Sequence, residues 1–287
     1  MEKTCFAVIG GDKRSFELAR LLKEKGHLVN IFGFNKLEDE GPDQSLSSSI
    51  NGVDIVIAPV PFTTDGRNIN APYNTEDIRI EGVFRNMTKR QKLIGGAISN
   101  ELMNISTEND ITTLDILKRE EMAVLNAIPT AEGGIQIALE EMPTTLHNSN
   151  VMVLGFGRIG KILSKMLNGI GSNVYVVVRK YSDISWIQAY GYKPIFIDDL
   201  HKHILEMDLI FNTIPNVILN EEILQMINKE TLIIDLASKP GGIDYAKAEE
   251  MNIKVIHALG LPGKVAPVSS AGFMMETIYN IIEELGV

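Results

Sequence analysis

The stretch from residue 150 to residue 180 constrains the fold more than any other part of the sequence. The apolar run at 151–154 has the composition of a strand and leads directly into Gly155-Phe156-Gly157-Arg158-Ile159-Gly160. Apolar residues then recur every three or four positions up to Gly169, where we expect the helix to end, and a second apolar run follows at 174–178. Strand, glycine turn, helix and strand in this order predict a βαβ unit around a G-x-G-x-x-G motif, the arrangement that binds dinucleotides.

Each glycine of the motif has its own mechanical role in such a unit. Gly155 makes the tight turn, Gly157 lets the backbone approach a pyrophosphate, and Gly160 lets the helix pack closely on the strand. We expect Arg158 and Ile159, at the start of the helix, to lie beside the phosphates with their backbone N–H groups. The alternative, glycines that merely end a strand, is disfavoured by the spacing and by the flanking pattern.

The residues that end the second strand favour NADP over NAD. NAD-binding proteins usually carry Asp or Glu at this place, which accepts hydrogen bonds from the ribose 2′-hydroxyl, whereas Arg accommodates a 2′-phosphate. Here the strand ends at Arg179-Lys180. A solvated arginine at the mouth of a loop is the alternative. We therefore expect NADP as the cofactor, with Arg179 and Lys180 at its 2′-phosphate.

The rest of the chain predicts two α/β domains, and a length of 287 residues agrees with that number. Strand and helix patterns alternate before the motif, which predicts a parallel, flavodoxin-like sheet. From the motif onward, the number of strands is that of a full Rossmann dinucleotide-binding domain. The predicted strands lie at 6–9, 28–34, 53–58, 92–94 and 111–117 in the first domain, and at 151–154, 174–178, 194–197, 208–212, 231–235 and 253–257 in the second.

Two helical patterns connect the predicted domains. One begins around Pro129, with Thr130 as its N-cap and Glu132 in its first turn; capping explains both side chains without any ligand. The other is an amphipathic helix at 270–285, which we expect to cross back and cover the first domain. The substrate-side domain is therefore predicted at residues 1–128 plus 270–287 and the Rossmann domain at 129–269, with the active cleft between them.

Composition limits the location and the partners of the chain. The net charge of −10 argues against nucleic acid and anionic membranes as partners. Because no long apolar span and no run typical of a signal peptide occurs, we expect a soluble cytoplasmic protein. The single cysteine, Cys5, excludes a disulfide within the chain, and we predict no metal site. The oligomeric state stays open, with a homo-oligomer among the alternatives.

Polar and glycine-rich segments follow several of the predicted strands, where the ligands of parallel sheets collect. They are Gly10-Gly11-Asp12 with Arg14, Ile98-Ser99-Asn100, residues 128–133, Asn212-Thr213-Ile214-Pro215, residues 235–242, and Gly260-Leu261-Pro262-Gly263. Together these segments resemble the A subunit of dipicolinate synthase, and the resemblance runs nearly from end to end.

The resemblance implies an NADP-linked oxidoreductase of spore-forming bacteria. Members of that family, with a flavoprotein-like B subunit, make dipicolinate (pyridine-2,6-dicarboxylate) from dihydrodipicolinate for sporulation. The family's fold is similar to that of D-2-hydroxyacid dehydrogenases, which agrees with two domains. The segments expected at the cofactor, in addition to the glycine motif, are Asn212-Thr213-Ile214-Pro215 and Ala237-Ser238.

A substrate with two carboxylates needs cationic or N–H partners. We predict Lys239 and Arg14 as the catalytic pair, which would bind opposite ends of the dicarboxylate while domain closure brings its ring onto the nicotinamide. Solvated charges at turns and helix starts are the alternative for both residues. The further residues predicted at the substrate are Ser99, Asn100, Thr130, Glu132 and Lys264.

Two other functions compete with this one. A D-2-hydroxyacid dehydrogenase would need a His and Glu pair in the cleft, but no His occurs from Gly260 onward. His257 ends a predicted strand, and we interpret it as structural because it has no identified carboxylate partner. A non-catalytic NADP-binding subunit would bind the cofactor without turnover.

Overall fold

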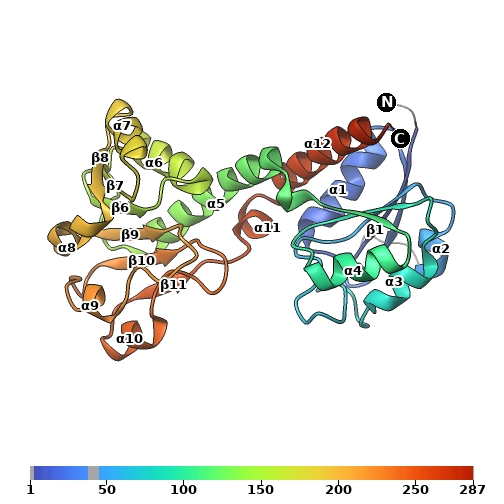
Figure 1. Cartoon of the computed structure of the whole chain (residues 1–287), viewed down its shortest axis with the longest axis horizontal. Helices are drawn as coiled ribbons and strands as arrows, with labels where there is room; N and C mark the ends of the chain where they lie inside the picture. The colour runs from blue at the N-terminus through green and yellow to red at the C-terminus, as the bar shows by residue number, and fades with distance from the viewer. Residues whose placement is uncertain (1–2, 38–44, 287) are drawn as a thin grey trace. The chain divides into compact units, whose positions relative to one another are not determined.

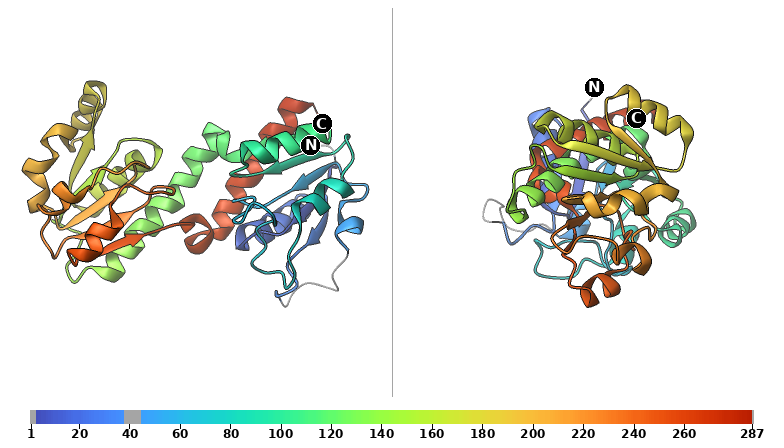
Figure 2. Two further views of the ribbon diagram at one scale, coloured as in Figure 1. Left: turned by 60° about the horizontal axis from the view of Figure 1, so that its bottom comes forward. Right: turned by 90° about the vertical axis from the view of Figure 1, so that its left-hand side faces the viewer.

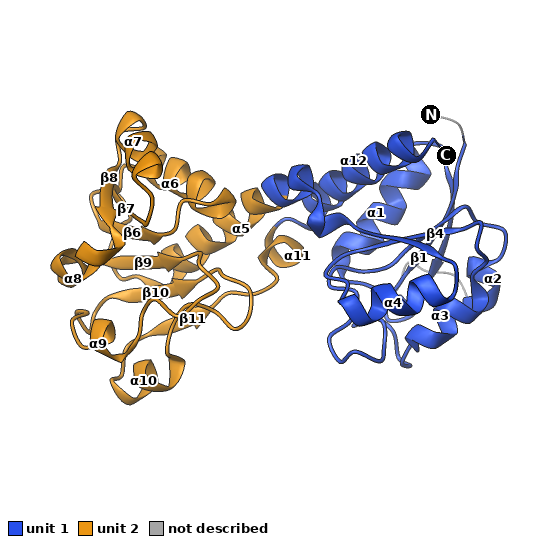
Figure 3. Ribbon diagram, viewed as in Figure 1, with its two compact units in different colours: residues 1–125, 266–287 blue, residues 126–265 orange. Residues whose placement is uncertain are grey.

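The computed structural model describes residues 3–37 and 45–286. The chain divides into two compact units, Met1–Leu125 with Ala266–Val287 (unit 1) and Asn126–Val265 (unit 2) (Figure 3). The boundaries predicted from the sequence, 128/129 and 269/270, fall a few residues later, inside helices α5 (Glu120–Glu141) and α12 (Pro267–Leu285).

Unit 1 is built around a parallel sheet with the strand order β2-β1-β3-β4-β5 (Figure 1). This is the flavodoxin-like order that the alternation of strands and helices predicted. The strands are β1 (Cys5–Ile9), β2 (Leu28–Phe32), β3 (Ile55–Ile57), β4 (Lys92–Gly95) and β5 (Thr112–Asp115). β5 is shorter than predicted, because Asp115 accepts a hydrogen bond from Leu117 N (2.9 Å) and begins a short 3₁₀ helix, Ile116–Lys118.

The prediction that the C-terminal helix returns to the first domain is confirmed. α12 lies against α1 (Lys13–Glu24) (Figure 1, Figure 2) and buries Met274, Ile278, Ile281 and Ile282 in the core of unit 1. It begins at Pro267, before the predicted start at 270, since proline fits the first turn of a helix, where its missing N–H costs no hydrogen bond. The other helices of unit 1 are α2 (Leu46–Ile50), α3 (Ile80–Asn86) and α4 (Asn100–Glu108).

Unit 2 is a doubly wound Rossmann domain. Its parallel sheet has the order β11-β10-β9-β6-β7-β8. The chain adds β7 and β8 on one side of β6 and then β9, β10 and β11 on the other, so the strand order switches between β6 and β9. The strands are β6 (Asn150–Leu154), β7 (Asn173–Val178), β8 (Lys193–Phe196), β9 (Leu209–Asn212), β10 (Leu232–Asp235) and β11 (Val255–His257). The helices that complete the unit are α6 (Arg158–Ile170), α7 (Tyr181–Ala189), α8 (Leu200–His203), α9 (Glu221–Leu224), α10 (Tyr245–Glu250) and α11 (Leu261–Val265).

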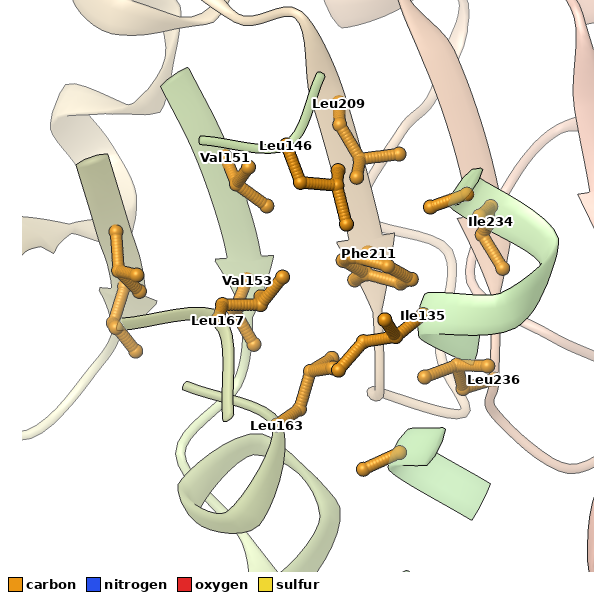
Figure 4. Packing of buried hydrophobic residues seen from close by; sticks show 14 of the residues in the cluster. Ile135, Leu146, Val151, Val153, Leu163, Leu167, Leu209, Phe211, Ile234 and Leu236 are labelled. Carbon is orange, nitrogen blue, oxygen red and sulfur yellow. The ribbon is translucent and has the colours of Figure 1, made fainter. Parts of the chain in front are cut away.

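The core of unit 2 fixes helix α6 against the central strands. Leu163 and Leu167 of α6 pack in one buried cluster with Val151 and Val153 of β6 and with Phe211 of β9 (Figure 4). The start of α6 is thereby held at the carboxyl end of β6. The helix ends at Ile170 with Gly171 as its C-cap (φ +94°), so the predicted end at Gly169 is wrong. Gly169 and Gly171 both fit the pattern of a glycine that ends a helix. Only residue 171 has the left-handed backbone that favours glycine.

The predicted start of the connecting helix is also wrong. α5 begins at Glu120, Pro129 lies inside it, and Thr130 is not an N-cap: its hydroxyl donates to the Asn126 carbonyl of the preceding turn (2.8 Å). Glu132 is an exposed residue of the helix interior. The helix continues through the proline because both of its halves are packed: Met122 is buried in the core of unit 1, and Ala131, Ile135 and Ala138 are buried in the core of unit 2.

Candidate functional site

The three glycines of the motif differ in what their surroundings require. Gly155 has a left-handed backbone (φ +98°), and a Cβ there would lie 2.7 Å from Thr213 Oγ1. A Cβ on Gly160 would lie 2.1 Å from the Gly155 carbonyl oxygen. A Cβ on Gly157 would have no heavy atom within 4 Å. Nothing in the described part of the chain therefore requires glycine at 157, and the open space in front of α6 fits the phosphates of a dinucleotide.

A pocket of about 670 Å³ lies at the carboxyl ends of β6, β7 and β9, beside this glycine turn. The predicted cofactor residues that line it are Gly155, Gly157, Arg179, Lys180, Thr213, Ile214 and Pro215. Phe156, Asp183 and Asn216 also line the pocket, but the sequence did not predict them at the cofactor. Phe156 lies within the glycine motif, Asn216 directly follows Pro215, and Asp183 lies in the first turn of the helix after Lys180. The structure thus brings the glycine turn, the end of β7 and the loop after β9 together.

The other predicted cofactor residues lie outside the lining of this pocket. Arg158 and Ile159 form the first turn of α6, and Gly160 is buried against the turn before it. Ala237, which is buried, and Ser238, which is exposed, follow β10. Asn212 has no solvent exposure.

Asp235, a residue without a predicted role, organises the loops that follow β9 and β10. Its side chain is fully buried. Oδ1 accepts hydrogen bonds from Asn212 Nδ2 (2.8 Å) and Ala237 N (2.9 Å), and Oδ2 accepts from Gly242 N (2.8 Å) and the Tyr245 hydroxyl (2.6 Å). Four donors thereby compensate the burial of one carboxylate. An acidic residue at the end of an otherwise apolar strand, followed by a pair of glycines, is the sequence signal that could have identified it.

Asn212 connects this carboxylate to the pocket beside the glycine turn. Its amide nitrogen also donates to the Ile214 carbonyl (2.9 Å), and its amide oxygen accepts from Ile214 N (3.1 Å). Thr213 donates its hydroxyl to the carbonyl of Leu154, directly before the glycine turn (2.8 Å). The Asn212 side chain is thus engaged by protein groups and holds the loop that lines the pocket.

Two glycines and two rings complete the Asp235 cluster. A Cβ on Gly241 would lie 2.4 Å from the Tyr245 hydroxyl oxygen, and one on Gly242 would lie 2.2 Å from Asn212 Nδ2. Burial, with a contribution from the hydrogen bond to Asp235, raises the pKa of Tyr245 above its usual range. The His257 ring stacks on Tyr245 (5.3 Å between centroids), and its Nε2 lies 3.0 Å from the Ala237 carbonyl oxygen. These contacts agree with a structural role for His257.

Arg14 is not a free cation, contrary to its predicted role at the substrate. Its side chain is buried, and its guanidinium donates to both carboxylate oxygens of Asp12, with Nη2–Oδ2 at 2.8 Å, and to the Val60 carbonyl. Asp12 is in turn the N-cap of α1 and accepts from Arg14 N (2.9 Å). The charge of Arg14 is therefore neutralised within unit 1, where the side chain ties the start of α1 to the segment after β3.

The remaining predicted substrate residues fall into two groups. Ser99 is the N-cap of α4, where it accepts from Leu102 N (3.2 Å), and the exposed Asn100 follows it. Lys239 and Lys264 are exposed cations of unit 2. Lys264 also lines a second pocket of about 310 Å³, together with His257 and α5 residues.

The described part of the chain was searched for groups of metal-binding side chains and for helices that could cross a membrane. Among residues 3–37 and 45–286, no group of His, Cys, Asp or Glu side chains could hold a metal ion. Within the same residues, no helix has the length and apolar character to cross a membrane.

The two units match two different family models. Residues 5–117 match the N-terminal domain of the A subunit of dipicolinate synthase, and residues 128–239 match the NAD-binding domain of D-isomer specific 2-hydroxyacid dehydrogenases. The A subunit of dipicolinate synthase from Bacillus subtilis (strain 168) is 34% identical over 285 residues, which cover 97% of this chain and 96% of the relative.

Two crystal structures are similar over almost the whole chain. The A chain of dipicolinate synthase from Bacillus subtilis matches with a TM-score of 0.89 and 30% identity, covering 100% of this chain and 98% of that one. The corresponding dipicolinate synthase chain from Bacillus halodurans matches with a TM-score of 0.88 and 29% identity, covering 97% of both chains.

Proposed function

The chain belongs to the family of dipicolinate synthase A subunits, and from this membership we propose that it oxidises dihydrodipicolinate to dipicolinate with NADP⁺. Its unit 2 is a dehydrogenase-type domain for a nicotinamide dinucleotide. On this proposal the chain acts in the cytoplasm during sporulation, together with a flavoprotein-like B subunit.

The proposed reaction removes one hydride and one proton from the dihydropyridine ring, which thereby becomes aromatic. Bound NADP⁺ supplies the acceptor for the hydride, and the proton leaves to solvent. Aromatisation itself favours the products, so the chain needs no strong base. What the chain must supply is the orientation of the ring and partners for two carboxylates.

The preference for NADP rests on Arg179 and Lys180, the observation that carries this part of the proposal. Both line the cofactor pocket at the end of β7, and both are exposed. No ion pair within the described residues engages either side chain, so their charges are available to a 2′-phosphate. Asp183, in the first turn of α7, lines the same pocket.

For the substrate carboxylates we propose Lys239 and Lys264. Both are exposed, and neither has an ion pair among the residues that the structure describes. Lys239 follows Ser238 and Ala237, and the backbone of Ala237 is fixed by Asp235. The Asp235 cluster thereby sets the direction in which the chain leaves β10 toward Lys239. Arg14, neutralised by Asp12, takes no part in this proposal.

The competing dehydrogenase chemistry has less support. In D-2-hydroxyacid oxidation a histidine with a carboxylate partner would act as the base, whereas His257 Nε2 lies at the Ala237 carbonyl and its ring stacks on Tyr245.

The test is to incubate the chain with dihydrodipicolinate and NADP⁺, with and without the B subunit, while the absorbance of NADPH and of dipicolinate is followed. Formation of both products supports the proposal. Binding of NADP without turnover in either mixture would instead assign the chain a non-catalytic role, and oxidation of D-2-hydroxy acids would favour the dehydrogenase.

A further inference from the structure

A buried hydrogen-bond acceptor in helix α5 lacks a donor among the residues that the structure describes. It is the side-chain oxygen Oδ1 of Asn126, the first residue of unit 2. The residue is half-buried and Oδ1 itself is buried, yet none of residues 3–37 and 45–286 donates a hydrogen bond to this atom. A buried polar group without a hydrogen bond costs free energy, so native proteins rarely keep one. A ligand that donates to Oδ1 would remove this cost.

Asn126 shares one face of α5 with residues that approach the end of β10. Thr130 and Gly134, four and eight positions later, lie on the same side of the helix. A Cβ on Gly134 would lie 3.2 Å from the side chain of Leu236, the residue that directly follows β10. Thr130 is buried, and its hydroxyl donates to the main-chain carbonyl of Asn126, so this contact does not engage the Asn126 side chain. This face of α5 is therefore turned to the loop after β10.

The direction of α5 places Asn126 beyond the carboxyl edge of the sheet. Near the other end of the helix, Glu141 pairs with Lys254 (2.6 Å), which directly precedes β11 at the amino edge. The helix thus runs from the carboxyl edge toward the amino edge, and Asn126 lies about two turns of helix before Gly134. Ligands of parallel sheets bind on this side, beyond the carboxyl ends of the strands.

The nicotinamide half of a dinucleotide would lie on the α5 side of the carboxyl edge. A dinucleotide binds across the switch in strand order, which here lies between β6 and β9. In the proposed function, Arg179 and Lys180 hold the adenosine half at the end of β7. The nicotinamide half then extends over β9 and β10, and these are the strands that α5 approaches through Gly134, close to Phe211 and Leu236.

Hydrogen-bonding chemistry separates the two ligands that could meet Oδ1. The carboxamide of nicotinamide carries N–H donors and a carbonyl acceptor, so it can pair with an asparagine side chain in both directions. Ionised carboxylates, such as the two of the substrate, only accept hydrogen bonds and cannot satisfy Oδ1. The unpaired oxygen therefore favours the cofactor over the substrate as the partner of Asn126.

We propose that Asn126 binds the nicotinamide carboxamide of the cofactor, with Oδ1 accepting a hydrogen bond from the carboxamide N–H. This contact fixes the rotation of the ring about its bond to the ribose, and thereby the ring face that meets the substrate. The proposal rests on the dinucleotide part of the proposed function and does not depend on the identity of the substrate.

The first test uses cofactor analogues with the unchanged full chain. Isothermal titration compares NADP⁺ with its 3-acetylpyridine analogue, in which a methyl group replaces the NH₂ of the carboxamide. The analogue should bind about threefold to tenfold more weakly, the scale of one lost hydrogen bond to a buried acceptor. The measurement needs neither turnover nor a substituted chain, so it holds even if a variant fails to fold.

The second test substitutes Asn126. Asn126→Ala should bind NADP⁺ and the analogue alike, because neither then meets an acceptor at this position. Its affinity for 2′-phospho-ADP-ribose, which lacks the nicotinamide ring, should equal that of the unchanged chain. Asn126→Asp retains acceptor oxygens, so it should still prefer NADP⁺ to the analogue. Circular dichroism at increasing temperature checks that each variant is folded.

Ser164→Ala is the matched control. The hydroxyl of Ser164 is also buried without a hydrogen-bond partner among the described residues. However, Ser164 has no solvent exposure within α6, so it cannot meet a ligand. This variant should keep the full preference for NADP⁺ over the analogue.

Three results would overturn the proposal. They are equal affinity of the unchanged chain for NADP⁺ and the analogue, an Asn126→Ala variant that keeps the preference, and a Ser164→Ala control that loses it. An Asn126→Ala variant that keeps the preference but has a raised KM for the dicarboxylate would assign Asn126 to the substrate instead.

The failure of the proposed function gives a different result. A chain that forms no dipicolinate refutes the proposed oxidation, whereas the titrations involve no turnover and still report on Asn126. If the unchanged chain binds NAD more tightly than NADP, NAD⁺ and its 3-acetylpyridine analogue replace the NADP pair in both tests, with the same expected results.

Discussion

The Tyr245 hydroxyl donates a 2.6 Å hydrogen bond to Oδ2 of Asp235, a carboxylate with no solvent exposure. The other oxygen of this carboxylate accepts a hydrogen bond from Asn212, whose amide fixes the loop that lines the pocket beside the glycine turn. The chain thus uses one buried charge to hold two loops at the carboxyl edge of the Rossmann sheet in place.

Tyr245→Phe should lower the free energy of unfolding of the chain by about 1–3 kcal/mol, because a buried carboxylate loses one of its four donors. Urea unfolding followed by circular dichroism measures this. Tyr175→Phe is a matched control, since the Tyr175 hydroxyl accepts from the exposed Lys193. An equal loss in both variants would contradict a special role for Tyr245.

The hydrogen bond between Tyr245 and Asp235 also predicts that the free energy of unfolding depends on pH. Burial, with Asp235, raises the pKa of Tyr245 above its usual value near 10. Because the folded state then binds this proton more tightly than the unfolded state does, the stabilisation is complete below pH about 10 and is lost as the pH rises beyond it. The difference in unfolding free energy between the unchanged chain and Tyr245→Phe should therefore shrink above pH about 10.

Gly157→Ala and Gly160→Ala should separate cofactor binding from folding. A Cβ at 157 meets nothing in the described chain, so the alanine should cost less than about 1 kcal/mol of stability while it weakens dinucleotide binding by about tenfold or more. A Cβ at 160 collides with the Gly155 carbonyl, so that variant should be strongly destabilised. Thermal unfolding and cofactor titration of each variant provide the two measurements. Unimpaired binding by Gly157→Ala would place the phosphates elsewhere.

Arg179→Asp should weaken NADP binding by ~1.5–3 kcal/mol, the scale of a lost charge-assisted hydrogen bond, and leave NAD binding almost unchanged. Isothermal titration with both cofactors measures this. Lys229→Asp, the same change of charge at an exposed residue outside the pocket, is the control. Equal affinity of the unchanged chain for NAD and NADP would refute the proposed role of Arg179.

Ile278→Ala should destabilise unit 1 by about 2–5 kcal/mol, because Ile278 has no solvent exposure in the core that α12 shares with α1. Removal of residues 270–287 should leave this core exposed and the chain poorly soluble. A soluble, folded chain that ends at Pro267 would contradict the importance of this packing.

The type of sheet in both units was predictable, because the alternation of strands and helices is a local pattern. Apolar runs that alternate with helical repeats give parallel sheets, and the glycine motif marks where the Rossmann domain begins. The start of α5 was not predictable from Pro129, since the same proline signal fits the first turn of a helix and a tolerated interior position. What decided between them was the burial of residues on both sides of the proline, in the cores of the two units, which depends on tertiary packing.

The candidate site also contains residues that were predictable from the sequence and contacts that were not. Seven residues that line the pocket beside the glycine turn were predicted at the cofactor, because they lie in short consecutive segments at strand ends. The pairing of Arg14 could not be predicted, because its contact with the Val60 carbonyl joins distant parts of the chain, and only the fold reveals its burial. The Asp235 cluster likewise combines residues from two strand ends and a helix start, which no single spacing predicts.

The kinetics of Lys239→Ala test whether this chain oxidises a dicarboxylate with Lys239 as a binding cation. With dihydrodipicolinate and NADP⁺, in the presence of the B subunit, the unchanged chain should form NADPH and dipicolinate in equal amounts. Lys239→Ala should lower kcat/KM for the dicarboxylate by about tenfold to a hundredfold, equivalent to ~1.4–3 kcal/mol, at unchanged NADP affinity. An unchanged chain that forms no dipicolinate would rule out the proposed oxidation, and a Lys239→Ala variant with normal turnover would rule out Lys239 as the binding cation.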